Sequence, residues 1–215
     1  VGCSKISAGC DHCYAIRMAN RFKHPHYQGL VSSMDWTGQI NRAPDHILNK
    51  PLSTKKRTVF FVNSMSDMFH DNVKDDWLVE IFDIMNQTPH HVFQILTKRP
   101  SRAVKKTKEL SLKWGNHMWA GVSIEEDKYA IPRSRELLKL PAMVRFVSCE
   151  PLLSALPSLP IEQLDWVIAG GESGIERSVR ASNINCVRDR RDRCRAAGVP
   201  FFFQQWGAVN AIGEQ

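Results

Sequence analysis

Three of the chain's six cysteines lie within eleven residues near the amino terminus, as Cys3, Cys10 and Cys13 in the spacing C-x6-C-x2-C. Thiolates this close together repel one another unless a cation shares their charge, and soft metals prefer thiolate ligands. The spacing therefore predicts a metal-binding loop. A structural zinc site usually has a fourth protein ligand, whereas a [4Fe-4S] cluster held by three cysteines leaves one iron open to a small molecule.

The cysteines are open to two alternative interpretations. The first is structural zinc, with a histidine as the fourth ligand; the candidates are His12, His24 and His26. The second is three disulfides, although this chain is larger than the small secreted scaffolds that depend on them. The other three cysteines are far apart in the sequence, and we expect ordinary buried or half-buried thiols at Cys149, Cys186 and Cys194.

Length and composition are typical of one soluble globular domain spanning residues 1–215, with 43% apolar and 24% charged residues. No apolar run approaches the roughly 20 residues that a membrane-spanning helix needs. The first residues also lack the charged and apolar regions of a signal peptide. We therefore expect a cytoplasmic protein that makes no membrane contact.

Apolar runs alternate with helical stretches, which predicts an α/β fold with a parallel sheet. The expected strands are residues 58–62, 91–96, 117–122, 144–148, 166–169 and 199–203, and the expected helices are residues 75–87, 101–110, 131–138 and 183–197. Residues 24–51 lack clear periodicity, and we interpret them as an irregular excursion that could cover the mouth of a pocket.

Polar residues follow each of the six predicted strands. In parallel barrels the carboxyl ends of the strands meet at the active site, so these residues are expected to line a pocket. Glu150 and Glu172 are the strongest candidates, because a carboxylate at the end of a buried strand needs a partner or a ligand. For Asp67 and His70 a helix-capping role is an equally good alternative.

Six ordered motifs together resemble the radical-SAM-like, phage-derived three-cysteine-motif family. They are the cysteine loop ending in CYA at 13–15, NSMSDMFH at 63–70, LTKRP at 96–100, CEPLL at 149–153, GGESG at 170–174 and FFFQQWG at 201–207. The resemblance covers nearly the whole chain. It implies a partial (β/α) barrel of the radical-SAM type, similar to a TIM barrel, with an iron–sulfur cluster at its mouth. In such a barrel the first strand precedes Cys3, so we expect that strand to be missing from this sequence.

The resemblance also implies S-adenosylmethionine as a cofactor and an electron donor as a partner. The cluster's open iron would chelate the amino and carboxylate groups of S-adenosylmethionine, whose reductive cleavage releases a radical. The predicted catalytic residues are Asp67, Glu150 and Glu172. The predicted cofactor-binding residues are Ser64, Ser66, Ser123, Gly170, Gly171, Glu172 and Ser173.

The sequence departs from the family pattern in three places. The usual loop is C-x3-C-x2-C, so the first spacer here is three residues longer. The triplet Gly170, Gly171 and Glu172 resembles the motif that holds the amino group of S-adenosylmethionine, but it lies far downstream of the usual place. Gln204 stands where the last motif is expected to carry lysine.

The formal charge of +7 is concentrated in two stretches, residues 98–108 and 177–195. Lysine and arginine clusters beside a pocket attract phosphates, so a nucleic-acid substrate is one expectation. Two functions follow. One is a radical S-adenosylmethionine enzyme of unknown substrate, and the alternative is a metal-stabilised nucleic-acid-binding module without turnover.

Overall fold

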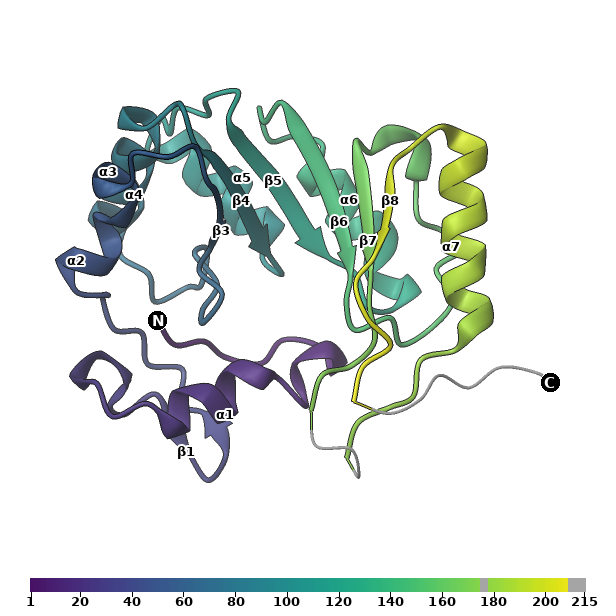
Figure 1. Cartoon of the computed structure of the whole chain (residues 1–215), viewed down its shortest axis with the longest axis horizontal. Coiled ribbons are helices and arrows are strands. Elements are labelled where there is room, and N and C mark those ends of the chain that lie inside the picture. The colour runs from purple at the N-terminus through teal and green to yellow at the C-terminus, as the bar shows by residue number, and fades with distance from the viewer. Residues whose placement is uncertain (175–177, 209–215) are drawn as a thin grey trace.

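The computed structural model describes residues 1–174 and 178–208, and its central element is a six-stranded sheet (Figure 1). All neighbouring strands are parallel, and their order in the sheet is their order in the chain. The strands are β3 (Val59–Val62), β4 (Val92–Thr97), β5 (Met118–Ser123), β6 (Val144–Cys149), β7 (Trp166–Ala169) and β8 (Phe201–Phe203). This sequential parallel order is that of an opened barrel.

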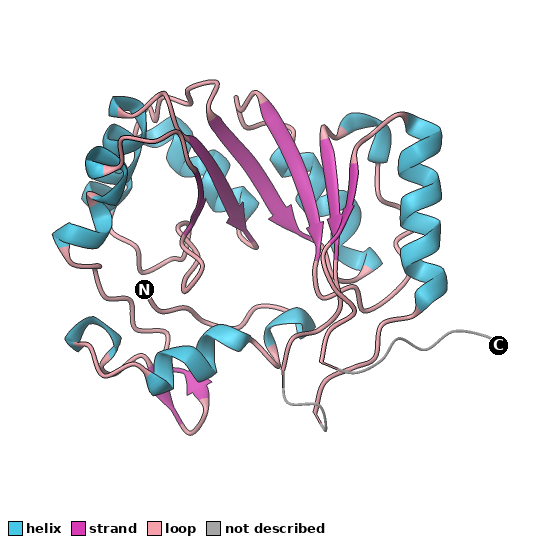
Figure 2. Ribbon diagram, in the orientation of Figure 1, coloured by secondary structure: helices cyan, strands magenta, loops and turns pink. Residues whose placement is uncertain are grey.

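Helices connect most of the strands and cover the outer face of the curled sheet (Figure 2). They are α4 (Asp75–Gln87), α5 (Pro100–Glu109), α6 (Ala130–Leu137) and α7 (Ile184–Ala197), with the short helix η3 (Asp127–Tyr129) before α6. Between β6 and β7 the chain forms only the short helix η4 (Ile161–Gln163). The inner face of the half-barrel therefore has no helical layer in the part of the chain that the structure describes.

Alternation along the strands decides which side chains enter the core. In β4, Phe93 and Ile95 are buried against the outer helices, whereas Gln94 and Leu96 on the other face are only partly buried. Phe82 of α4 also belongs to this core. Burial of a side chain of this size contributes about 1.5–3 kcal/mol, so the outer face of the sheet is where stability is concentrated.

The first part of the segment before β3 lies at the carboxyl ends of the strands, whereas α2 (Asp45–Leu48) and α3 (Lys50–Ser53) at its end lie beside α4 (Figure 1). The first part contains η1 (Ala8–Cys10), α1 (Tyr14–Arg21), η2 (Pro25–Tyr27) and the hairpin β1 (Val31–Ser32) and β2 (Asp35–Trp36). The irregular excursion predicted at 24–51 thus holds only short elements, and its Trp36 lines the pocket described below.

Within the described residues no strand precedes Cys3, and β3 forms the first edge of the sheet. Gly2 makes a single parallel bridge to Ser66, and its N–H donates to the Met65 carbonyl at 3.2 Å. The chain just before the cysteine loop therefore runs beside the segment that follows β3.

The predicted α/β architecture with six parallel strands is confirmed, and the sheet is a half-barrel. Each predicted strand and helix overlaps an observed one, with ends that differ by no more than two residues. Among the described residues, no helix combines the length and apolar character that crossing a bilayer requires.

Candidate functional site

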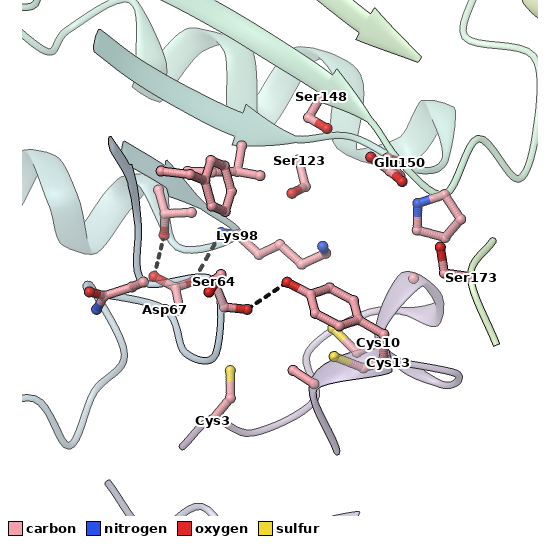
Figure 3. A pocket seen from close by; sticks show the side chains of 18 of the residues that line it. Cys3, Cys10, Cys13, Ser64, Asp67, Lys98, Ser123, Ser148, Glu150 and Ser173 are labelled. Atoms are coloured by element: carbon pink, nitrogen blue, oxygen red, sulfur yellow. Dashed lines mark hydrogen bonds between the residues drawn. The ribbon is translucent and has the colours of Figure 1, made fainter. Parts of the chain in front are cut away.

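One pocket, with a volume of about 550 Å³, occupies the carboxyl ends of the strands and the inner face of the half-barrel (Figure 3). Cys3, Cys10 and Cys13 all line it, and Figure 3 shows their sulfur atoms on the side that faces the strand ends. The structure therefore brings the three predicted ligands to one cavity. The other cysteines lie elsewhere: Cys149 and Cys194 are buried in the core, and Cys186 is half-buried.

All six cysteines are free thiols, so the disulfide interpretation is wrong for this structure. Residues 1–174 and 178–208 contain no group of three or more His, Cys, Asp or Glu side chains close enough to hold a single metal ion. A single ion gathers its ligands around one point, whereas in a cluster each cysteine binds a different iron atom. The three free thiols thus line one cavity without forming a single-ion site among the described residues.

Asp67, one of the predicted catalytic residues, is engaged in a buried network. Its Oδ1 accepts hydrogen bonds from the Phe69 N–H at 2.9 Å and the Thr97 hydroxyl at 2.7 Å. Its Oδ2 accepts from the Lys98 N–H at 3.0 Å and from Nη1 of Arg99 at 3.2 Å. The next helix begins at Asp75, with Lys74 as its N-cap, so the helix-capping alternative is wrong. Asp67 instead ties the segment after β3 to the end of β4.

Arg99 carries this network to the cysteine loop. Its Nη2 donates to the Ser4 carbonyl at 3.1 Å and to the Ser4 hydroxyl at 2.9 Å, and its Nη1 lies 3.9 Å from Sγ of Cys3. Burial and nearby Asp67 raise the pKa of the Cys3 thiol, and Arg99 opposes them. The buried guanidinium thus fixes the first end of the loop and faces its first sulfur.

His70, the other residue considered for capping, also contacts Ser4. Its Nδ1 accepts a hydrogen bond from the Asn72 N–H at 3.1 Å, so its Nε2 carries the proton that is donated to the Ser4 hydroxyl at 2.8 Å. Burial, aided by the positive charge of Arg99, lowers the pKa of His70. A neutral histidine and a charged arginine therefore hold the same serine.

At the other end of the cysteine loop, Glu172 pairs with an arginine in the same way that Asp67 pairs with Arg99. Its carboxylate accepts from the Arg180 N–H at 2.8 Å and from Nε at 3.0 Å, and it pairs with Nη2 as well. That Nη2 also donates to the Ala8 carbonyl at 2.8 Å, and Nη1 lies 3.6 Å from Asp11. Burial raises the pKa of Glu172, but the hydrogen bonds from Arg180 outweigh it and the pKa falls below its ordinary value.

The two ends of the cysteine loop are thus held by two arginines, each backed by a buried carboxylate. We call these pairs, Arg99 with Asp67 and Arg180 with Glu172, the arginine clamps. Both carboxylates line the pocket, yet they already have cationic partners. Sequence reasoning singled out the acids and missed the positioning role of the arginines.

Glu150 differs, because in the described residues it has only an amide partner. Nε2 of Gln205 donates to its Oε1 at 3.2 Å, and Lys98 acts on it only through its charge. Burial raises its pKa, with Gln205 and Lys98 opposing the shift. Figure 3 shows Glu150 with Ser123 and Ser148 at the strand ends, across the pocket from the cysteines. It is the predicted carboxylate best placed to bind a ligand or exchange a proton.

Most of the predicted cofactor-binding residues share the pocket, namely Ser64, Ser66, Ser123, Gly171, Glu172 and Ser173. Gly170 does not line the pocket, but it packs against Glu150, which does. A Cβ on Gly170 would lie 3.0 Å from the Glu150 carboxyl carbon. A Cβ on Gly171 would lie 1.8 Å from the Trp206 carbonyl oxygen, so only glycine allows the two backbones to approach.

Tyr14, which we did not predict, closes one side of the pocket. Its hydroxyl donates to the Ser64 carbonyl at 2.7 Å and joins α1 to the segment after β3. Burial, together with the negative charge of Cys13 and Glu150, raises the pKa of Tyr14. It follows Cys13 directly, so its position in the cysteine motif was the available signal.

The predicted basic clusters are largely engaged within the protein. In the first, Arg102 pairs with Asp71, and Lys106 pairs with Asp75 and Glu109. In the second, Arg190 is buried, Arg193 donates to two backbone carbonyls, and Arg177 lies outside the described residues. Lys98 differs from these residues, since Figure 3 shows its ammonium group directed into the pocket.

The fold and the site together define a parallel α/β half-barrel with a thiol-lined pocket at the carboxyl ends of its strands. Residues 1–214 match the family described as "Protein of unknown function (DUF5131)", and the chain belongs to this family. The searches of curated proteins and of solved structures found no match.

Proposed function

We propose that this protein is an iron–sulfur enzyme of the radical S-adenosylmethionine type. The observation that carries the proposal is that Cys3, Cys10 and Cys13, all free, line one pocket at the carboxyl ends of six parallel strands. These thiols would hold a [4Fe-4S] cluster, leaving one iron for a small molecule. When bound, the cluster would supply an electron and a coordination site for S-adenosylmethionine.

The residues of the chain have three tasks in this proposal. The arginine clamps hold the loop so that its sulfurs face the pocket, because both ends of the loop are tied to the barrel. Ser64, Ser123 and Ser173 offer hydrogen-bonding groups to the polar parts of the cofactor. The half-barrel and Tyr14 form walls of the pocket, and such walls are needed to limit the access of water when a reactive species is formed.

Glu150 is the residue to which we assign proton exchange or cation binding. Burial raises the pKa of this carboxyl, and among the described residues only the amide of Gln205 donates a hydrogen bond to it, so its oxygens are accessible for proton exchange with a bound molecule. Asp67 and Glu172 are assigned to positioning, because their oxygens are hydrogen-bonded to the clamps.

Anaerobic expression and purification provide the test. The expected preparation is brown, contains about four iron atoms and four sulfides per chain, and cleaves S-adenosylmethionine to 5'-deoxyadenosine after reduction. The matched control is Cys10→Ala, which should be colourless and inactive. A colourless wild-type protein that contains zinc would contradict the proposal and favour a metal-stabilised nucleic-acid-binding module.

A further inference from the structure

The deep part of the pocket differs from its thiol-lined mouth, because aromatic side chains form its wall. Phe61 of β3 and Phe202 of β8 are 47% and 52% exposed, although both belong to the central sheet. They lie on the two edge strands, and both line the same cavity. Half-exposed phenylalanines gathered in one cavity indicate a binding surface.

These rings face the hollow of the half-barrel because of strand alternation. Their neighbours Phe60, Phe201 and Phe203 pack against the core on the outer face. Phe61 and Phe202 must therefore face the inner side. The two edges of the sheet each present one aromatic ring to the cavity.

Each edge also presents an amide beside its ring. Gln94 is the direct strand neighbour of Phe61 on β4, and Gln204 follows Phe202 by two residues, which places it on the same side. Both amides line the pocket, and the described part of the chain offers neither side chain a hydrogen-bond partner. An amide in an aromatic setting can read the hydrogen-bonding edge of a planar ring.

Two aromatic side chains, Phe146 and Trp166, line the cavity between the two edges. Phe146 lies over Gly121 of the next strand, where a Cβ would come within 2.3 Å of the ring. Glycine thus lets this ring lie against the sheet. Trp166 continues the surface, with its ring centroid 5.4 Å from that of Phe146. At the polar end of the same cavity stands the ammonium group of Lys98.

We infer that the inner face of the half-barrel binds the nucleobase of a nucleotide substrate. Phe61 and Phe202 stack on the base, Gln94 and Gln204 pair with its edge, and Lys98 attracts the phosphate. Aromatic stacking accepts any base, whereas an amide selects among base edges. The inference rests on the proposed function only in treating the nucleotide as a substrate, since base binding itself needs no cluster.

Titration of the protein with the common nucleoside monophosphates tests this inference, with binding measured by calorimetry and by tryptophan fluorescence. Ribose 5-phosphate is the control for phosphate binding alone. At least one nucleotide is expected to bind more tightly than ribose 5-phosphate. Phe61→Leu and Phe202→Leu should each weaken binding by about fivefold or more, the range that loss of one stacking ring produces.

The amides have a separate readout. Gln94→Leu and Gln204→Leu keep the size of the side chain and should change the preference among bases more than the average affinity. Phe22→Leu is the matched control, because that ring is exposed on the surface outside the pocket and its loss should change nothing.

Four results would overturn the inference. The first is that no nucleotide binds more tightly than ribose 5-phosphate, and the second is that all the variants bind nucleotide with equal affinity. The third is loss of nucleotide binding when S-adenosylmethionine saturates the protein, and the fourth is a dimer that Phe202→Asp converts to a monomer. The third would assign the ring site to the cofactor, and the fourth would assign it to a second copy of the chain. The same titration with Cys10→Ala separates the two proposals, since base binding should persist there while iron is lost.

Discussion

Arg180 donates a hydrogen bond from Nη2 to the backbone carbonyl of Ala8 at 2.8 Å, across 172 positions of sequence. This contact joins the cysteine loop to the segment that precedes α7. Because the same guanidinium is paired with Glu172, its orientation is set by the barrel. The placement of Cys10 thus depends on a residue from the opposite end of the chain.

Removal of this clamp should loosen the loop. In the metal-free protein, Arg180→Ala should increase the alkylation rate of Cys10 and Cys13 about tenfold, because a charge-assisted hydrogen bond contributes roughly 1.5–3 kcal/mol to local stability. Mass spectrometry after timed alkylation measures the rate at each site. Arg180→Lys should restore part of the protection, and Arg188→Ala on the exposed surface of α7 is the control. Unchanged rates in Arg180→Ala would show that the clamp does not position the loop.

The second clamp is more deeply buried, so its loss should be costly for the whole fold. Asp67→Asn leaves Arg99 without its buried partner, and breaking such a pair typically costs about 3–5 kcal/mol. Urea denaturation of the variant gives the difference in unfolding free energy. Asp83→Asn on the exposed face of α4 should cost less than about 0.5 kcal/mol. A stable Asp67→Asn protein that has lost only turnover would instead support direct catalysis by Asp67.

Glu150 should make the protein less stable as pH rises. Its pKa in the folded state is raised by burial, so between the unfolded value, about 4.3, and the folded value the folded state binds more protons. Stability from this group is full below that window and is lost as pH rises through it. Glu150→Gln should therefore gain stability relative to wild type with rising pH, as measured by urea unfolding at a series of pH values. A constant difference would mean that the carboxyl is not shifted.

Glu172 should have the opposite effect on the pH dependence of stability. Its pKa is lowered in the folded state through Arg180, so its contribution is full above the unfolded pKa and is lost as pH falls through the folded pKa. Glu172→Gln should cost about 1–2 kcal/mol at neutral pH, a modest value because Arg180 is partly exposed and solvent screens the pair. The same denaturation series should show this cost shrinking in acid. A cost that stays constant with pH would argue against the ion pair.

Much of the fold follows from local patterns. The run at 166–169 is a strand with the predicted limits, and the helix predicted at 75–87 has the limits of α4, because short apolar runs and helical periodicity are properties of neighbouring residues. The polar residues after each strand led to the pocket for the same reason. Parallel strands place their carboxyl ends together whatever the details of packing.

The partners of the site residues could not be predicted in this way. Asp67 and Glu172 resemble catalytic acids in sequence, and only the folded chain shows that Arg99 and Arg180 hold them. His91 is another example, because it is buried and accepts a hydrogen bond from the N–H of Thr58, which is 33 positions away in the sequence. Contacts between distant segments are decided by tertiary packing, which no local pattern carries.

The central claim is that three cysteines hold iron, and iron content tests it most directly. Anaerobic preparations of Cys3→Ala, Cys10→Ala, Cys13→Ala and Cys186→Ala should be compared with wild type by metal analysis and visible absorption. We predict that each of the first three variants loses its iron and the absorption of the cluster, while Cys186→Ala retains both. Equal iron in all four variants, or zinc in place of iron in the wild-type protein, would contradict the account.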